Sequence, residues 1–168
     1  MTRAQLPALG YVYVVLAVPA LCVGTDHTHL AAALFTGAAF AYLWFVASLI
    51  AKLVRFDPDG FFASVVVLGG AGFVALQAVA LFESATEAAA ASSACAATVI
   101  IGSSLAALRA RKIPHWFGRA GVVGGVAVLV VGVIEGAADW TLASDALFAS
   151  SLGFMFWVVV TATYLLRR

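Results

Sequence analysis

Six long apolar runs constrain this chain more than any other feature of its sequence. The runs cover residues 8–24, 29–52, 61–82, 88–108, 120–138 and 147–166. A helix that crosses the hydrocarbon core of a bilayer needs about 20 mainly apolar residues, and inside lipid only helices and closed barrels satisfy every backbone polar group. The runs lack the alternating pattern of barrel strands. The sequence therefore predicts an all-α integral membrane protein, with six transmembrane helices in a single bundle domain over residues 1–168.

The composition agrees with a lipid environment. Hydrophobic residues make up 64% of the chain and charged residues 10%, whereas roughly a quarter of the residues in an ordinary soluble protein are charged. The connections between the runs are short, so no soluble domain separates them. The formal net charge is +1, and we expect no nucleic-acid partner.

The charged residues fall on two opposite sides of the predicted bundle. With six spans, all nine Lys and Arg residues lie at the N-terminus, in the second and fourth connections or at the C-terminus. Six of the eight acidic residues lie at or near the other side. Because basic residues concentrate in cytoplasmic segments, we expect a multi-pass protein of the cell membrane with both termini in the cytoplasm.

A weak internal repeat relates the first predicted hairpin to the last. When the chain is shifted by 113 residues, residues 26–55 align with residues 139–168 at nine identical positions, and Trp44 falls on Trp157. The two hairpins, spans 1–2 and 5–6, run in the same direction. Transporters are often built from such repeats, with a site near the repeat interface. A parallel duplication and convergent patterning are the two interpretations of this match.

Two tryptophans near the middle of their predicted spans are unusual, because tryptophan prefers the membrane interface. Phe40 lies close to Trp44 in the sequence, and Phe154 lies close to Trp157. These rings indicate either packing between helices, with each indole N–H bonded to a neighbour, or an apolar wall that holds a lipid tail, a quinone or a pigment.

Acidic groups and two histidines gather at the predicted outer side. The turn TDHTHL holds Asp26, His27 and His29. Imidazole and carboxylate groups suit zinc, copper or nickel, so this turn is a candidate site for a divalent metal on the outer face. Its His-x-His spacing is not a diagnostic metal motif, and ordinary solvated side chains produce the same pattern. The sequence requires no cofactor.

Glu135 lies about one turn inside the predicted boundary of its span. An ionisable group within the membrane marks a functional site by default. Together with Asp139, Glu83 and Gln77, it forms a candidate ion or proton site. Gln77 also has a structural interpretation, because side-chain amides form hydrogen bonds between membrane helices.

Glycines recur at four-residue spacing in the fifth run, at Gly121 and Gly125 and again at Gly132 and Gly136. Small residues at this spacing let helices approach closely in lipid. We expect this span to lie at the centre of the bundle. The same pattern also suits contact within a homo-oligomer or a larger membrane complex.

The fourth connection, RARKIPHWFGR, carries a cluster of basic residues. The cluster consists of Arg109, Arg111, Lys112 and Arg119. These side chains suit the headgroups of anionic membrane lipids. They equally suit a purely topogenic role that keeps the connection in the cytoplasm.

The motifs of common enzymes are missing. The chain has no P-loop, GxGxxG, GxSxG, HExxH or CxxC pattern. An intramembrane hydrolase would need a nucleophile with a nearby base, and no such pair is evident. We expect no catalytic activity. Cys22 and Cys95 fall in the same predicted leaflet, where a disulfide is geometrically feasible if their helices touch.

The stretches RKIPHWFGRAGVVGGVAVLVVG and FMFWVVVTATYLLRR resemble uncharacterised small six-span membrane proteins of bacteria and archaea. Those proteins share a basic loop of the PxW type before a Gly-rich span, and a last span that contains Trp and ends in Arg. The likeness covers about the last 60 residues, and His115 stands where a basic residue is usual. It implies a helical membrane fold and brings no known activity.

Two functions of different classes fit these features. The first is non-catalytic: an accessory or scaffold subunit, or a bundle that binds lipid or a cofactor. The second is a small transporter or channel for a cation or proton that uses Glu135 and the outer acid and histidine cluster. A water-filled path to Glu135 and Gln77 indicates transport, whereas a solid core of Gly and Ala indicates a structural role.

Overall fold

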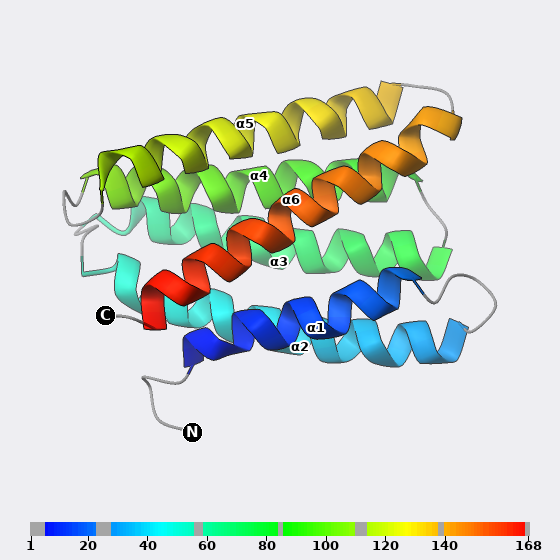
Figure 1. Cartoon of the computed structure of the whole chain (residues 1–168), viewed down its shortest axis with the longest axis horizontal. Coiled ribbons are helices and arrows are strands. Elements are labelled where there is room, and N and C mark those ends of the chain that lie inside the picture. The colour runs from blue at the N-terminus through cyan, green and yellow to red at the C-terminus, as the bar shows by residue number, and fades with distance from the viewer. Residues whose placement is uncertain are drawn as a thin grey trace. The chain divides into compact units, whose positions relative to one another are not determined.

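The computed structural model is helical throughout the residues that it describes. It describes residues 6–22, 28–55, 59–83, 86–109, 114–137 and 140–166. Side chains are described for residues 7–20, 30–55, 59–80, 87–134 apart from 89 and 110–113, and 151–164. These residues form a short 3-10 helix, six α-helices and no strand. The elements are η1 (Leu6–Ala8), α1 (Leu9–Cys22), α2 (Thr28–Leu53), α3 (Phe61–Glu83), α4 (Thr86–Arg109), α5 (His115–Ala137) and α6 (Trp140–Leu166), shown in Figure 1.

Four of these helices are long and apolar enough to cross a membrane. Their apolar stretches are Leu30–Leu53 of α2, Phe61–Ala80 of α3, Ala90–Arg109 of α4 and His115–Ile134 of α5. The apolar stretches found in α1 and α6 are shorter, Leu9–Ala20 and Ser151–Tyr164, within the described residues. The all-helical, membrane-compatible architecture is therefore confirmed. The count of six spans stays a prediction.

The last two helices begin earlier than their apolar runs. α5 begins at His115, directly after Pro114, and so includes part of the stretch expected to be a connection. Proline is tolerated there because the first N–H groups of a helix have no intrahelical partner. α6 begins at Trp140 rather than at residue 147. An apolar run marks the part of a helix that lipid can cover, but backbone hydrogen bonds continue the helix beyond it.

Gly60 sets the start of α3. Its φ of 68° lies in the left-handed region, where glycine has no steric penalty. Its carbonyl accepts hydrogen bonds from the backbone N–H of Ser64 at 3.0 Å and from the Ser64 hydroxyl at 2.8 Å. This turn places Phe61 and Phe62 in the first turn of the helix.

The chain divides into two compact units. The first comprises Met1–Leu49 and Val158–Arg168, and the second comprises Ile50–Trp157. In the first unit, the Tyr11 hydroxyl and the Thr163 hydroxyl form a hydrogen bond of 2.6 Å between α1 and α6. In the same unit, the rings of Tyr13 and Tyr42 lie 5.1 Å apart. The single-domain description stays a prediction.

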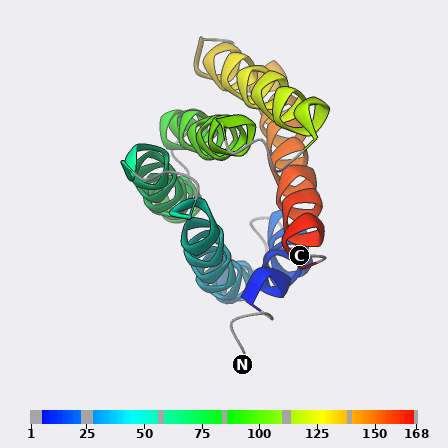
Figure 2. The ribbon, with the colours of Figure 1, turned by 90° about the vertical axis from the view of Figure 1, so that its left-hand side faces the viewer.

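In the second unit, α4 lies between α3 and α5 (Figures 1 and 2). Of its apolar stretch 61% is buried, against 28% for the corresponding stretch of either neighbour. Within this unit α4 is therefore the central helix, and not the Gly-rich α5 as the sequence led us to expect. Glycines give α5 one smooth face, but α5 also carries exposed valines such as Val123 and Val133. By contrast, α4 has small residues on both of the sides that its neighbours cover.

Candidate functional site

Glycines of α5 bring its backbone into direct contact with α4. A Cβ atom at Gly132 would lie 2.6 Å from the Cβ of Ser93, and one at Gly125 would lie 2.5 Å from Cγ1 of Ile101. The contact continues toward the start of α5, where Gly121 meets Ser104 and Gly118 meets Leu108. As α5 residue numbers rise, those of their α4 partners fall, so the two helices are antiparallel. We call this contact the α4–α5 seam.

The opposite side of α4 packs on α3 with similar closeness. A Cβ atom at Gly69 would lie 3.0 Å from the carbonyl oxygen of Cys95, and one at Gly72 would lie 2.9 Å from the Cys95 sulfur. Here α4 contributes a glycine too, since Gly102 lies against Val65. Cys95 is a free thiol that packs where Gly72 has no side chain. The side chain of Cys22 lies outside the described residues.

Gln77 is hydrogen bonded within the second unit. Its side-chain N–H donates to the hydroxyl of Ser92 at 2.9 Å, which joins α3 to α4. Ser103 donates its hydroxyl to the backbone carbonyl of Val99 at 2.6 Å. Ser92 and Ser103, two buried polar residues of α4, are thus hydrogen bonded, as is usual for polar groups surrounded by apolar side chains.

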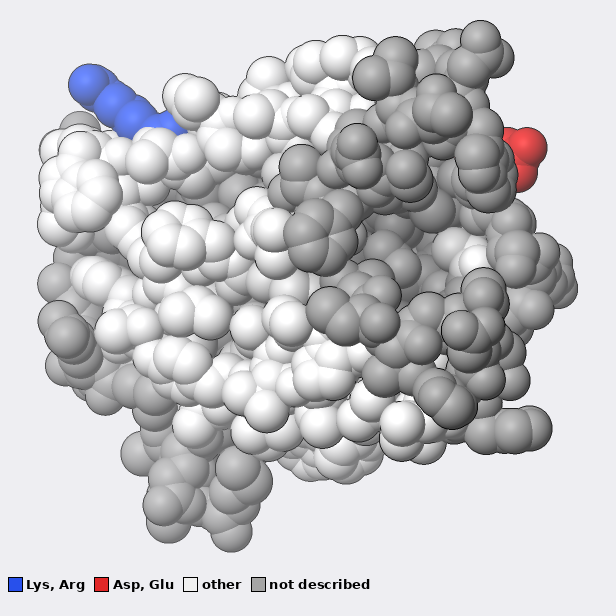
Figure 3. Space-filling view, turned by 45° about the vertical axis from the view of Figure 1, so that its right-hand side comes forward, with Lys and Arg blue, Asp and Glu red and all other residues white. Residues whose placement is uncertain are grey.

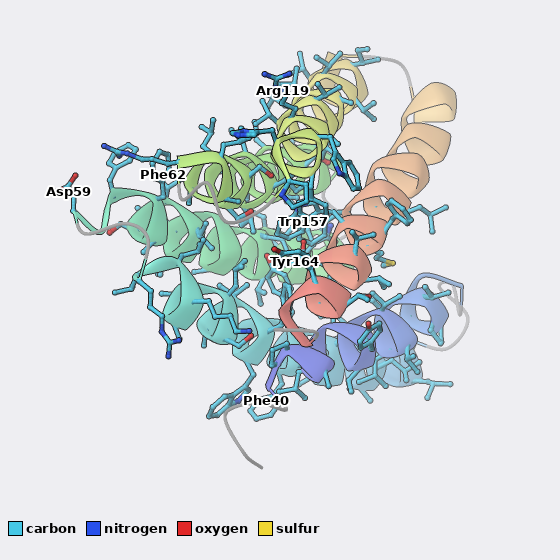
Figure 4. The ribbon with its side chains drawn as sticks, turned by 60° about the vertical axis from the view of Figure 1, so that its left-hand side comes forward. Phe40, Asp59, Phe62, Arg119, Trp157 and Tyr164 are labelled. Carbon is cyan, nitrogen blue, oxygen red and sulfur yellow. The ribbon has the colours of Figure 1, made fainter. Side chains whose placement is uncertain are left out.

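Phe154 and Trp157 of α6 lie in an aromatic cluster in the second unit. The rings of Phe73 and Phe154 are 4.7 Å apart, and those of Phe154 and Trp157 are 6.1 Å apart and nearly parallel. The indole nitrogen of Trp157 lies 3.8 Å from the Cβ position of Gly121 on α5 (Figure 4). The three rings are less than 10% exposed, so this cluster packs between helices.

Trp44 and Phe40 lie in different surroundings. Trp44 is 46% exposed and Phe40 is 63% exposed, and their rings are 6.1 Å apart on the outer surface of α2. Trp157, the counterpart of Trp44 in the aligned hairpins, is 9% exposed. The two tryptophans therefore serve different packing roles, despite their matching positions in the sequence.

Most of the candidate outer-face side chains lie outside the described part of the chain. Asp26, His27 and Asp139 are outside the described residues, and so are the side chains of His29, Glu83 and Glu135. Among the described residues, no group of three or more His, Cys, Asp or Glu side chains is placed to hold a metal ion. The candidate metal and ion sites stay predictions.

The basic residues that are described gather at one end of the second unit. The antiparallel order of α3, α4 and α5 brings Arg109 and Arg119 to this end and places Glu87 at the other end. The guanidinium carbon of Arg109 lies 5.9 Å from the centre of the Phe62 ring. On the face shown in Figure 3, the described side chains between a basic group at one end and an acidic group at the other are uncharged. Arg111 and Lys112 lie outside the described residues.

Two features of this unit were not anticipated from the sequence. One is the contact of the Arg109 guanidinium with the Phe62 ring. The sequence pattern that could have indicated it is a pair of aromatic residues at the start of one span and an arginine at the end of the next. The other is Ser92 as the partner of Gln77. A run rich in Ala and Ser, with few large side chains, signals a helix that neighbours approach from several sides.

Comparison with known proteins identifies no relative: no family model, curated protein or solved structure matches this chain.

Proposed function

We propose that this chain is a non-catalytic scaffold of the cell membrane, a six-span bundle with both termini in the cytoplasm. Its role is to hold a fixed helical surface in the bilayer for a partner subunit or a second copy. The observation that carries this proposal is the close contact along α4, where glycines on both neighbouring helices meet its backbone and Cβ atoms.

A transport path along α4 is disfavoured by the same contacts. The positions of Gly125, Gly132 and Gly72 lack room for a methyl group. A water molecule needs space of its own and two to four polar partners, so a seam that excludes a methyl group excludes a water file too. Gln77, whose side chain is the one described in the candidate ion site, donates a hydrogen bond to Ser92.

The outer surface suits lipid contact. Val123, Val130 and Val133 on α5 are each at least half exposed, and such side chains are stable when acyl chains cover them. The charge separation between Glu87 at one end and Arg109 and Arg119 at the other supports a membrane-spanning orientation with the basic end in the cytoplasm. The six-span count extends this orientation to both termini.

Reconstitution separates a scaffold from a transporter. The purified full chain is placed in liposomes that contain proton-sensitive and cation-sensitive dyes, and native mass spectrometry follows the same preparation. A scaffold gives no flux above empty liposomes and a single fixed assembly stoichiometry. A proton or cation flux that Gln77→Leu or Glu135→Gln abolishes, while helicity and thermal stability are retained, contradicts the proposal and establishes the transporter.

A further inference from the structure

Arg109 and Arg119 project from the same side of the α4–α5 pair. Leu108 packs against Gly118, and each arginine follows its contact residue by one position. One residue turns an α-helix by about 100°. Because the two helices are antiparallel, this turn carries both side chains toward the same side of the pair. His115 comes four residues before Arg119 and shares that side of α5.

The described basic and imidazole side chains on this side of the helix pair are accessible. Arg109, His115 and Arg119 are all exposed, and Figure 4 shows Arg119 projecting away from the helices. α6 packs on a different side of α5: Val128, nine residues and so about half a turn around from Arg119, lies 3.9 Å from the Cβ position of Gly153.

Phe62 gives Arg109 a defined position. Its ring lies beneath the guanidinium at 5.9 Å, a cation–π distance. Within the described part of the chain, Arg109 contacts this ring and no carboxylate. A guanidinium that rests on a ring keeps its N–H edge available, and that planar edge matches two oxygens of one phosphate group.

Exposed apolar side chains continue from the two arginines along the same side. Leu105 lies one turn before Arg109 and is 38% exposed, and Val126 lies two turns after Arg119 and is 47% exposed. Val126 is about 10 Å from the level of Arg119 at 1.5 Å per residue. One leaflet of the hydrocarbon core is about 15 Å thick. An acyl chain that starts at the arginines therefore runs over these side chains.

We infer that this surface is a binding site for one anionic phospholipid. Arg109, His115 and Arg119 receive the phosphate and the acidic headgroup, while Leu105 and Val126 contact an acyl chain. The inference rests on the membrane placement proposed above and adds a specific lipid class and site to it. Arg55, an exposed arginine in the turn after α2, lies outside this surface.

The test counts bound lipids by native mass spectrometry of the full chain in detergent. Phosphatidylglycerol and phosphatidylcholine with identical acyl chains are titrated separately. The wild-type chain binds phosphatidylglycerol more tightly. Arg109→Ala lowers that affinity about fivefold, since one basic residue near anionic lipid contributes about 1 kcal/mol. Phe62→Leu lowers it about twofold through loss of the ring. Neither variant changes phosphatidylcholine binding.

The matched control is Arg55→Ala, which removes the same charge elsewhere and leaves the affinity within twofold of wild type. Equal losses in Arg55→Ala and Arg109→Ala refute the site, and so does equal affinity for the two lipids. Arg109→Lys retains the charge and supplies a second variant if Arg109→Ala does not fold; it should still lose part of the preference. Displacement of the lipid by soluble glycerol phosphate at similar concentration would show a free-phosphate site and also refute the inference.

The outcome is independent of the scaffold proposal. A chain that forms one fixed assembly, carries no flux and shows no lipid preference retains its proposed function without this site. A chain that transports ions and still prefers phosphatidylglycerol through Arg109 retains the site without the scaffold role.

Discussion

Replacement of Gly132 by alanine should separate helix packing from helix propensity. In the native seam, a Cβ atom added at Gly132 would lie 2.6 Å from the Cβ of Ser93 and 3.2 Å from the carbonyl oxygen of Ala90. Two carbon atoms in favourable contact are about 3.5–4.0 Å apart. Both opposing atoms are fixed to the α4 backbone, so no rotamer change relieves the clash. The two helices must move apart by about 1 Å.

The expected cost follows from two opposing effects. Overpacking of a well-packed contact destabilises by about 1–3 kcal/mol, whereas Gly to Ala within a helix stabilises by roughly 0.8–1 kcal/mol. Gly124→Ala isolates the second effect, because a Cβ atom at Gly124 meets nothing within 4 Å. The difference between the two variants therefore reports packing alone, and it should favour Gly124→Ala by about 1–3 kcal/mol.

Thermal unfolding followed by helical circular dichroism in one detergent measures this difference. At about 2–4 °C per kcal/mol for a chain of this size, Gly132→Ala should melt roughly 2–12 °C below Gly124→Ala. Equal melting temperatures for the two variants would show that α4 and α5 do not meet at this seam, and the scaffold proposal would lose its main support.

Three further predictions concern other parts of the structure. Gln77→Leu and Ser92→Ala should each destabilise the protein by about 0.6 kcal/mol, an average value for a hydrogen bond between membrane helices. The double variant should lose less stability than the sum of the two single losses. Strictly additive losses would refute the Gln77–Ser92 hydrogen bond. Thr161→Val should raise the melting temperature, because the buried Thr161 hydroxyl has no hydrogen-bond partner among the described residues. Burial of an unsatisfied polar group costs about 1–3 kcal/mol. A lower melting temperature would show that the hydroxyl has a partner. Cysteines placed at the exposed positions Asp59 and Glu87 should react with a membrane-impermeant reagent from opposite sides of the membrane, Glu87 from outside; reaction of both from one side would refute the proposed orientation.

The positions of the helices followed from the sequence. Each run long enough to span a bilayer became a helix, because a chain in lipid must satisfy its N–H and C=O groups within the same segment. This requirement is local, so the length and apolar character of a run are sufficient to predict it. The helix starts at His115 and Trp140 were missed because hydropathy does not report where backbone hydrogen bonding stops.

The candidate site was only partly accessible from the sequence. Gln77 and Arg109 were recognised as polar groups near apolar spans, but Ser92 and Phe62, the residues that they contact, were not. Each partner lies on the neighbouring antiparallel helix, and the register between two helices is not encoded in either helix alone.

Only the tertiary structure decided which helix is central and which tryptophan is buried. The glycines of α5 showed that it has a smooth face, but they did not show that α4 would lie against that face and receive α3 on its other side. Trp44 and Trp157 occupy matching sequence positions, yet one is exposed on α2 and the other packs with Phe154. In lipid, no difference in hydrophobicity selects the neighbours of a helix; the fit of side chains and backbones across non-local contacts selects them.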